Sequence, residues 1–175
     1  MSQTKSYPPS GPQGSEVATG IKVSSAELEL GCINLISQLE MQIESARSGS
    51  GHVEKASVNT DKLLSVLLDF CDQYFDGDTA GVALESIEKA SFASLAHREV
   101  LSSLGWGFAV RNLFGKSVCS DDRVRQTYDS LGNALLTACV SVLRQAVLAV
   151  GCDSAVGKTI EQSTAVFVEE FKANW

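Results

Sequence analysis

Two histidines and five cysteines are among the side chains of this 175-residue chain whose types suit metal binding or nucleophilic chemistry. The cysteines are widely spaced, with no Cys-x-x-Cys pair and no histidine nearby to complete a metal set: Cys32, Cys71, Cys119, Cys139 and Cys152. A zinc site needs several such ligands close together, and a disulfide framework needs an even set of cysteines. The pattern therefore favours neither.

The run His97-Arg98-Glu99 is the nearest approach to a catalytic or cofactor-binding group. A histidine on a helix can hold a haem iron from the proximal side, and a histidine beside an acid is one part of a nucleophile–base set. No serine or cysteine pairs with it in the sequence, and a solvated helix face or a packing residue also explains the run. We expect no stand-alone enzyme, and haem binding through His97 is a minor hypothesis.

The segment from Gly151 to Thr159 has some likeness to a phosphate-binding loop that follows an apolar run. Its two glycines are separated by five residues where the motif has four, and only 16 residues follow Thr159. That leaves no room for the strand and helix units that surround such a loop. We expect a connection between two helices, closed by an N-cap.

Composition excludes other function classes. The formal net charge is −7 and no basic stripe is present, which argues against a nucleic-acid partner. The first residues lack the apolar run of a secretory signal. The most apolar segment, 134–150, is interrupted by polar residues and is too short for a membrane span, so we expect a buried core helix and no transmembrane segment.

The spacing of apolar residues predicts an all-α domain over residues 20–175, behind a flexible tail over 1–19 that holds all three prolines. Ser24 and Glu27 form a capping box for a first helix that ends near Arg47. A second helix is expected from 59–61 to 76–78. Apolar residues at helical spacing continue over 80–114, and Gly105 and Gly107 weaken the prediction of a helix in the middle of this segment.

The remaining helices are predicted from their end signals. Ser120 is a candidate N-cap, Gly132-Asn133 a candidate interruption and Gly151 a helix end. A last helix is expected over 154–172. The inner faces are predicted to include Leu28, Cys32, Leu35, Ile36, Leu39 and Ile43, then Leu63, Leu64, Leu67, Leu68, Cys71 and Phe75, and later Val82, Ile87 and Leu95.

Several blocks of the chain resemble the phycobiliproteins, globin-like helical light-harvesting proteins that bind linear tetrapyrroles (bilins). Residues 20–28, GIKVSSAEL, are similar to the opening of the family's first globin-type helix. Residues 115–118, 121–124 and 127–132 are similar to the family's G-D-x-S-x-L-D-x-R and E-T-Y-x-x-L-G blocks, with about three residues missing between the halves. The resemblance touches about two thirds of the chain and implies a globin-like fold.

The resemblance places Ala96-His97-Arg98-Glu99 where the family has C-x-R-D. Ala96 stands in place of the cysteine that forms the thioether to the bilin, so the usual attachment is impossible. Three alternatives follow from the resemblance: a bilin on Cys71 or Cys152, a bilin held without a covalent bond by Arg98 and Glu99, or a pigment-free scaffold subunit. It also implies a homo- or hetero-oligomer with related helical subunits, on the cytoplasmic or stromal side and at the periphery of a photosynthetic membrane.

A different interpretation needs no cofactor. Exposed apolar residues, with Trp106 and Trp175 as examples, can dock a partner, which makes the chain a helical interaction or regulatory module. The sequence leaves this alternative open beside the light-harvesting one.

Overall fold

Five α-helices form the part of the chain that the computed structural model describes, residues 20–47, 52–103 and 122–175. They are α1 (Ser25–Arg47), α2 (His52–Tyr74), α3 (Gly77–Ser103), α5 (Asp122–Val150) and α6 (Ala155–Asn174). These ranges contain no strand, only an isolated bridge between Ile21 and Phe75. The all-α prediction is confirmed, whereas the predicted tail over 1–19 lies outside the described residues.

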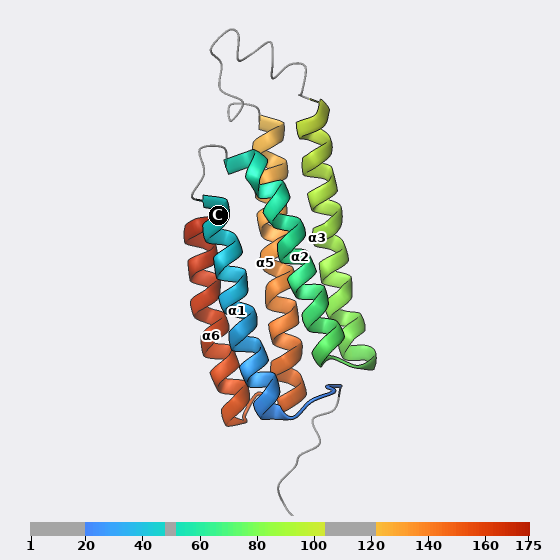
Figure 1. Cartoon of the computed structure of the whole chain (residues 1–175), viewed down its shortest axis with the longest axis vertical. Helices are drawn as coiled ribbons and strands as arrows, with labels where there is room; N and C mark the ends of the chain where they lie inside the picture. The colour runs from blue at the N-terminus through green and yellow to red at the C-terminus, as the bar shows by residue number, and fades with distance from the viewer. Residues whose placement is uncertain (1–19, 48–51, 104–121) are drawn as a thin grey trace, which may run out of the picture.

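The helices run along a common long axis, and each described helix points opposite to the one before it (Figure 1). α1 packs against α2 and α6, α2 against α3, α3 against α5, and α5 against α6. α5 also contacts α1 and α2. It is therefore the central helix of the bundle.

The start of α1 follows the predicted capping box. The Glu27 backbone N–H donates to the Ser24 hydroxyl at 3.3 Å, and the Ser24 N–H donates to the Glu27 carboxylate at 2.9 Å. The hydrogen bond that the carboxylate accepts from the Ser24 N–H, and a second one from the Ser24 hydroxyl at 2.9 Å, lower the pKa of Glu27. The segment before the helix is tied to the α2–α3 turn, since the Lys22 N–H donates to the Tyr74 carbonyl at 2.9 Å.

The core consists mainly of Leu, Ile, Val, Phe and Cys side chains of α1, α2, α5 and α6. All six residues predicted for the inner face of the first helix are buried. α5 contributes the longest buried row: Val124, Leu131, Leu135, Ala138, Cys139, Val142, Leu143, Ala146, Val147 and Val150. Length and composition alone would let α5 cross a membrane, but such a test is also met by the core helix of a bundle, and 44% of its most apolar window is buried here.

Two helix boundaries differ from the prediction. α2 begins at His52, several residues before the predicted 59–61, because Glu, Lys and Ala, the residue types at 54–56, favour a helix. α5 continues through Gly132 and Asn133, where an interruption was predicted. Gly132 is buried against the Trp175 indole. A glycine here allows the close approach of the indole and does not end the helix.

Three predicted core residues point outward. Leu68 of α2 is 44% exposed, Val82 of α3 is 48% exposed and Leu95 of α3 is 56% exposed. α3 instead buries Ala83, Ile87, Ala90, Ser94 and His97. These residues recur at spacings of four and three and form one face, whose small side chains let α3 lie close to α5. The predicted features at 105, 107 and 120 lie outside the described residues.

Candidate functional site

His97 is a buried packing residue between α3 and α5, with no exposed surface. Its Nδ1 lies 2.9 Å from the Thr127 hydroxyl oxygen, and that hydroxyl lies 2.9 Å from the Arg123 carbonyl. A hydroxyl has one hydrogen, which goes to the carbonyl, so Thr127 accepts the Nδ1–H of His97. The geometry therefore assigns the tautomer that carries its proton on Nδ1.

This tautomer leaves the Nε2 lone pair of His97 directed away from Thr127, as in histidines that bind metals. The ring is nevertheless fully buried and lies 5.9 Å from the Tyr128 ring, centroid to centroid. The described residues also contain no group of three or more His, Cys, Asp or Glu side chains that could hold a metal ion.

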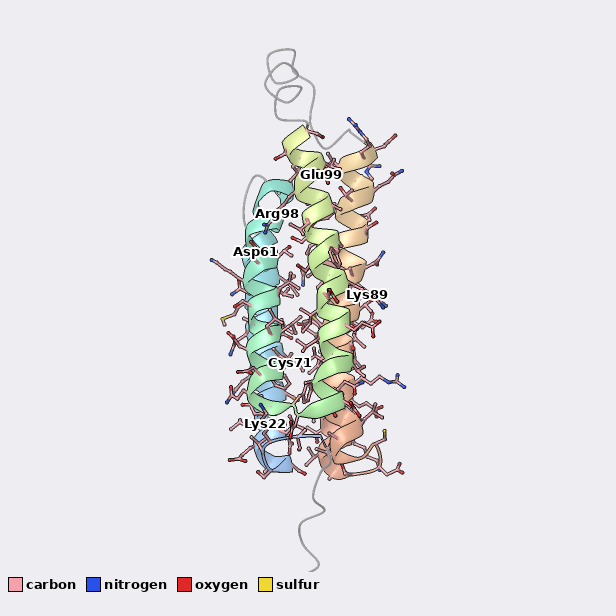
Figure 2. All side chains as sticks on the ribbon, turned by 90° about the vertical axis from the view of Figure 1, so that its right-hand side faces the viewer. Lys22, Asp61, Cys71, Lys89, Arg98 and Glu99 are labelled. Atoms are coloured by element: carbon pink, nitrogen blue, oxygen red, sulfur yellow. The ribbon has the colours of Figure 1, made fainter. Side chains whose placement is uncertain are left out.

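Arg98 and Glu99 leave α3 in directions different from His97. Arg98 forms an ion pair with Asp61 of α2, and Glu99 is exposed (Figure 2). Successive residues of a helix are about 100° apart around its axis, so His97, Arg98 and Glu99 leave α3 in different directions. A bilin held by Arg98 and Glu99 without a covalent bond stays a prediction.

The two cysteines singled out by the resemblance differ in access. Cys71, on α2, is 2% exposed in the core, and burial raises the pKa of its thiol to about 11. Cys152 is exposed, in the short turn between α5 and α6. Cys152 therefore lies at one end of the bundle and residues 97–99 toward the other (Figure 1). The structure does not bring the predicted site residues together.

A shallow groove of about 270 Å³ lies beside Cys152, between α5 and α6. Its wall is mainly apolar, from Val140, Val147, Leu148 and Ala165, and Arg144 and Glu161 supply the charges. This is the one surface hollow described here that includes a sequence-predicted site residue.

The glycine-rich turn after α5 uses its backbone donors internally. Gly151 has a φ of +92°, and the Ser154 hydroxyl caps α6 by accepting the Gly157 N–H at 2.9 Å. The Ser154 N–H donates to the Gly151 carbonyl at 3.1 Å. The prediction of an interhelical loop with an N-cap is confirmed.

Trp175, suggested by the sequence as a docking residue, packs within the fold. Its ring stacks on Tyr128 at 4.7 Å and on Phe171 at 5.5 Å between centroids, and its indole N–H donates to the Tyr128 carbonyl at 3.3 Å. These contacts hold the end of α6 on α5. The other suggested tryptophan, Trp106, lies outside the described residues.

Sequence reasoning missed the outer face of α3. Leu84, Phe92 and Leu95 are 42%, 62% and 56% exposed. Leu84 and Leu68 of α2 line a groove between α2 and α3, which we call the α2–α3 groove. A signal was present, because the large apolar residues of 80–95 are spread around the helix while its alanines recur on one side. Reading Ala83 and Ala90 as the inner row would have placed the larger residues outside.

Comparison with known proteins gives no relative: no protein-family model matches the chain, and neither a curated protein nor a solved structure is significantly similar to it.

Proposed function

We propose that this chain is a helical interaction module that needs no cofactor and binds a helix of a partner protein on the outer face of α3. The observation that carries the proposal is the pattern of α3, which buries mainly small residues and only one large apolar residue, Ile87, but exposes Leu84, Phe92 and Leu95. A surface helix normally shows the reverse arrangement. Clustered exposed apolar residues mark interaction sites more often than isolated ones do.

The shape of this face suits a helix as the partner. Leu84, Ser91 and Leu95 are seven and four residues apart, so they line one side of α3. Leu68 lies on the opposite wall, and Gly81 has open space above it. Amphipathic helices bind such grooves through apolar anchors at i, i+4 and i+7.

An unbiased selection tests this function. Helical peptides from a randomised display library are selected against the full chain, and their contact sites are mapped by hydrogen exchange. We expect selected peptides to share an apolar face, to protect α2 and α3, and to lose binding to the Leu95→Ser variant.

Leu30→Ser is the matched control, because Leu30 is 60% exposed on α1, away from the groove. Selected peptides that bind Leu95→Ser as well as they bind the unaltered chain would contradict the proposal, and so would a selection that yields no helical binder.

The light-harvesting function implied by the resemblance is a second proposal, favoured by the exposed Cys152 beside an apolar groove. In it, a linear tetrapyrrole is carried on Cys152 and its acid groups face Arg144. The thiol adds across a carbon–carbon double bond of the pigment: the S–C bond forms, the thiol proton goes to the neighbouring carbon, and no oxidant is consumed. The globin-like arrangement is not confirmed, since globin helices cross at about 50° whereas these run close to one axis.

An absorption spectrum of the chain co-produced with a bilin supply tests the second proposal. Colour that survives acid urea and is lost in Cys152→Ser, but kept in Cys71→Ser, would support it. A colourless protein, or colour that depends on Cys71, would contradict it. At pH 8 a thiol of pKa about 11 is thiolate in about one molecule in a thousand, which slows addition at Cys71 even where it is reached.

A further inference from the structure

The groove between α2 and α3 is the largest of the surface hollows described here, at about 470 Å³. Ile87 is buried at its base, and Leu68 and Leu84 form its apolar walls. Gly81 and Ser91 keep it open, since neither carries a large side chain. The groove lies on the side of the bundle that faces the viewer in Figure 2.

The rim of the groove is acidic. Glu85 and Glu88 of α3 line it, and Asp72 lies one turn beyond Leu68 on α2. Between residues 60 and 103 the sequence has eight acidic and three basic side chains, a net charge of −5 out of −7 for the whole chain: Asp61, Asp69, Asp72, Asp76, Asp78, Glu85, Glu88 and Glu99 against Lys62, Lys89 and Arg98. Two of those bases are paired with acids of the same region, Lys89 with Glu85 and Arg98 with Asp61.

This charge narrows the choice of occupant. An anionic lipid surface or a nucleic acid would be repelled by the rim. A second copy of this chain docked symmetrically would place one acidic rim against the other, which is unfavourable. A partner with positive charge on either side of an apolar stripe complements both the walls and the rim.

We infer that the α2–α3 groove binds a basic amphipathic helix of another protein, with apolar anchors at i, i+4 and i+7 and Lys or Arg on both flanks. The inference rests on the proposed interaction function and adds the charge of the partner. The apolar anchors lie along Leu68, Leu84 and Leu95, and the basic flanks face Glu88 and Asp72. Charge of this kind speeds association and selects the partner more than it raises affinity.

Three designed helical peptides with the same apolar stripe test the inference. Their flanks carry Lys, Gln or Glu, and binding to the full chain is measured by fluorescence anisotropy. We expect the Lys peptide to bind about tenfold more tightly than the Gln peptide at low salt, the Glu peptide to bind most weakly, and the Lys preference to fall at about 0.5 M salt, where charges are screened beyond a few ångströms.

Variants separate the walls from the rim. Leu95→Ser weakens all three peptides, whereas Glu88→Gln reduces only the preference for the Lys peptide. Leu30→Ser on α1 changes neither the binding of the three peptides nor the preference for the Lys peptide. Because Leu95, Glu88 and Leu30 are all exposed, these substitutions leave the core intact.

The outcomes distinguish the two proposals. Equal binding of the Lys and Gln peptides, lost in Leu95→Ser, overturns the basic partner and keeps the helix-binding function. Failure of all three peptides to bind overturns both. Tighter binding of the Glu peptide, binding to vesicles of anionic lipid, or an equal effect of Leu30→Ser overturns the assignment of this groove to a basic helix.

Discussion

α5 and α3 lie side by side, yet they use their apolar residues in opposite ways. α5 places its large side chains in the core, with Leu131, Leu135 and Leu143 fully buried. α3 turns alanines toward α5 and leaves Leu84, Phe92 and Leu95 exposed. The stability of the bundle should therefore depend on the large residues of α5 and on the small residues of α3. The large exposed residues of α3 remain available for binding.

The largest expected effect is on the α5 side of this comparison. Leu135→Ala should lower the free energy of unfolding by about 2–5 kcal/mol, because it leaves a cavity among fully buried side chains. Leu84→Ala on α3 should change it by less than about 0.5 kcal/mol. Urea unfolding followed by circular dichroism measures both. A similar loss in the two variants would break the comparison, since it would mean that the outer face of α3 is already covered within the chain.

The small residues of α3 give the next effect. Ala90 is fully buried, so Ala90→Leu should force α3 away from α5 and cost about 1–3 kcal/mol. Ala96→Leu places the same side chain on the exposed side of the helix and should be nearly neutral. Thermal unfolding of the two variants sharpens the comparison, and equal melting temperatures would contradict a close α3–α5 contact.

Substitution of one glycine in each of the two helices should have a smaller effect on stability. A methyl group at Gly132 of α5 meets the Trp175 indole, so Gly132→Ala should cost about 1–2 kcal/mol. Gly81→Ala on α3 adds a methyl group in open space and should stabilise the helix by about 0.5–1 kcal/mol. If the clash with Trp175 is the cause, Gly132→Ala should no longer destabilise a Trp175→Ala background. Unfolding in urea gives the free energy of unfolding of the three single variants and of the Gly132→Ala/Trp175→Ala double variant, each compared with the unaltered chain.

The smallest effect lies away from both helices, in the groove between α1 and α6. Burial raises the pKa of Glu40, and the hydrogen bond and charge of Glu170 raise it further. The folded state therefore holds this proton more tightly than the unfolded state, so stability falls as pH rises through the pKa of Glu40 and the cost is complete at neutral pH.

Glu40→Gln should remove that cost and raise stability at pH 7 by a few tenths of a kcal/mol, about the size of an exposed charge pair. The gain should vanish below the pKa of Glu40, where the side chain is already neutral. Glu169→Gln, on the exposed side of α6, is the control. Unfolding curves of the variants and the unaltered chain at pH 4 and pH 7 measure this gain in stability. A gain of equal size at both pH values would contradict the raised pKa of Glu40 as its cause.

The local signals in the sequence determined much of the fold. The Ser24–Glu27 capping box, the helix end at Gly151 and the N-capped loop before the last helix depend on neighbouring residues alone, and each is present as predicted. The inner face of the first helix and the all-α class also follow from spacing, because a buried stripe repeats with the period of the helix.

The sequence allowed two inner faces for α3, one of large apolar residues and one of alanines; the tertiary structure decided between them and so located the candidate site. The large apolar residues of α3 suggested a core face, but the close approach to α5 favours Ala83 and Ala90, and the burial of α5's own leucines fills the core that Leu95 would have entered. For the same reason the sequence could not show that Gly132 packs against Trp175, or that residues 97–99 lie toward the opposite end of the bundle from Cys152. Such contacts join residues distant in the chain, and only the packing of whole helices sets them.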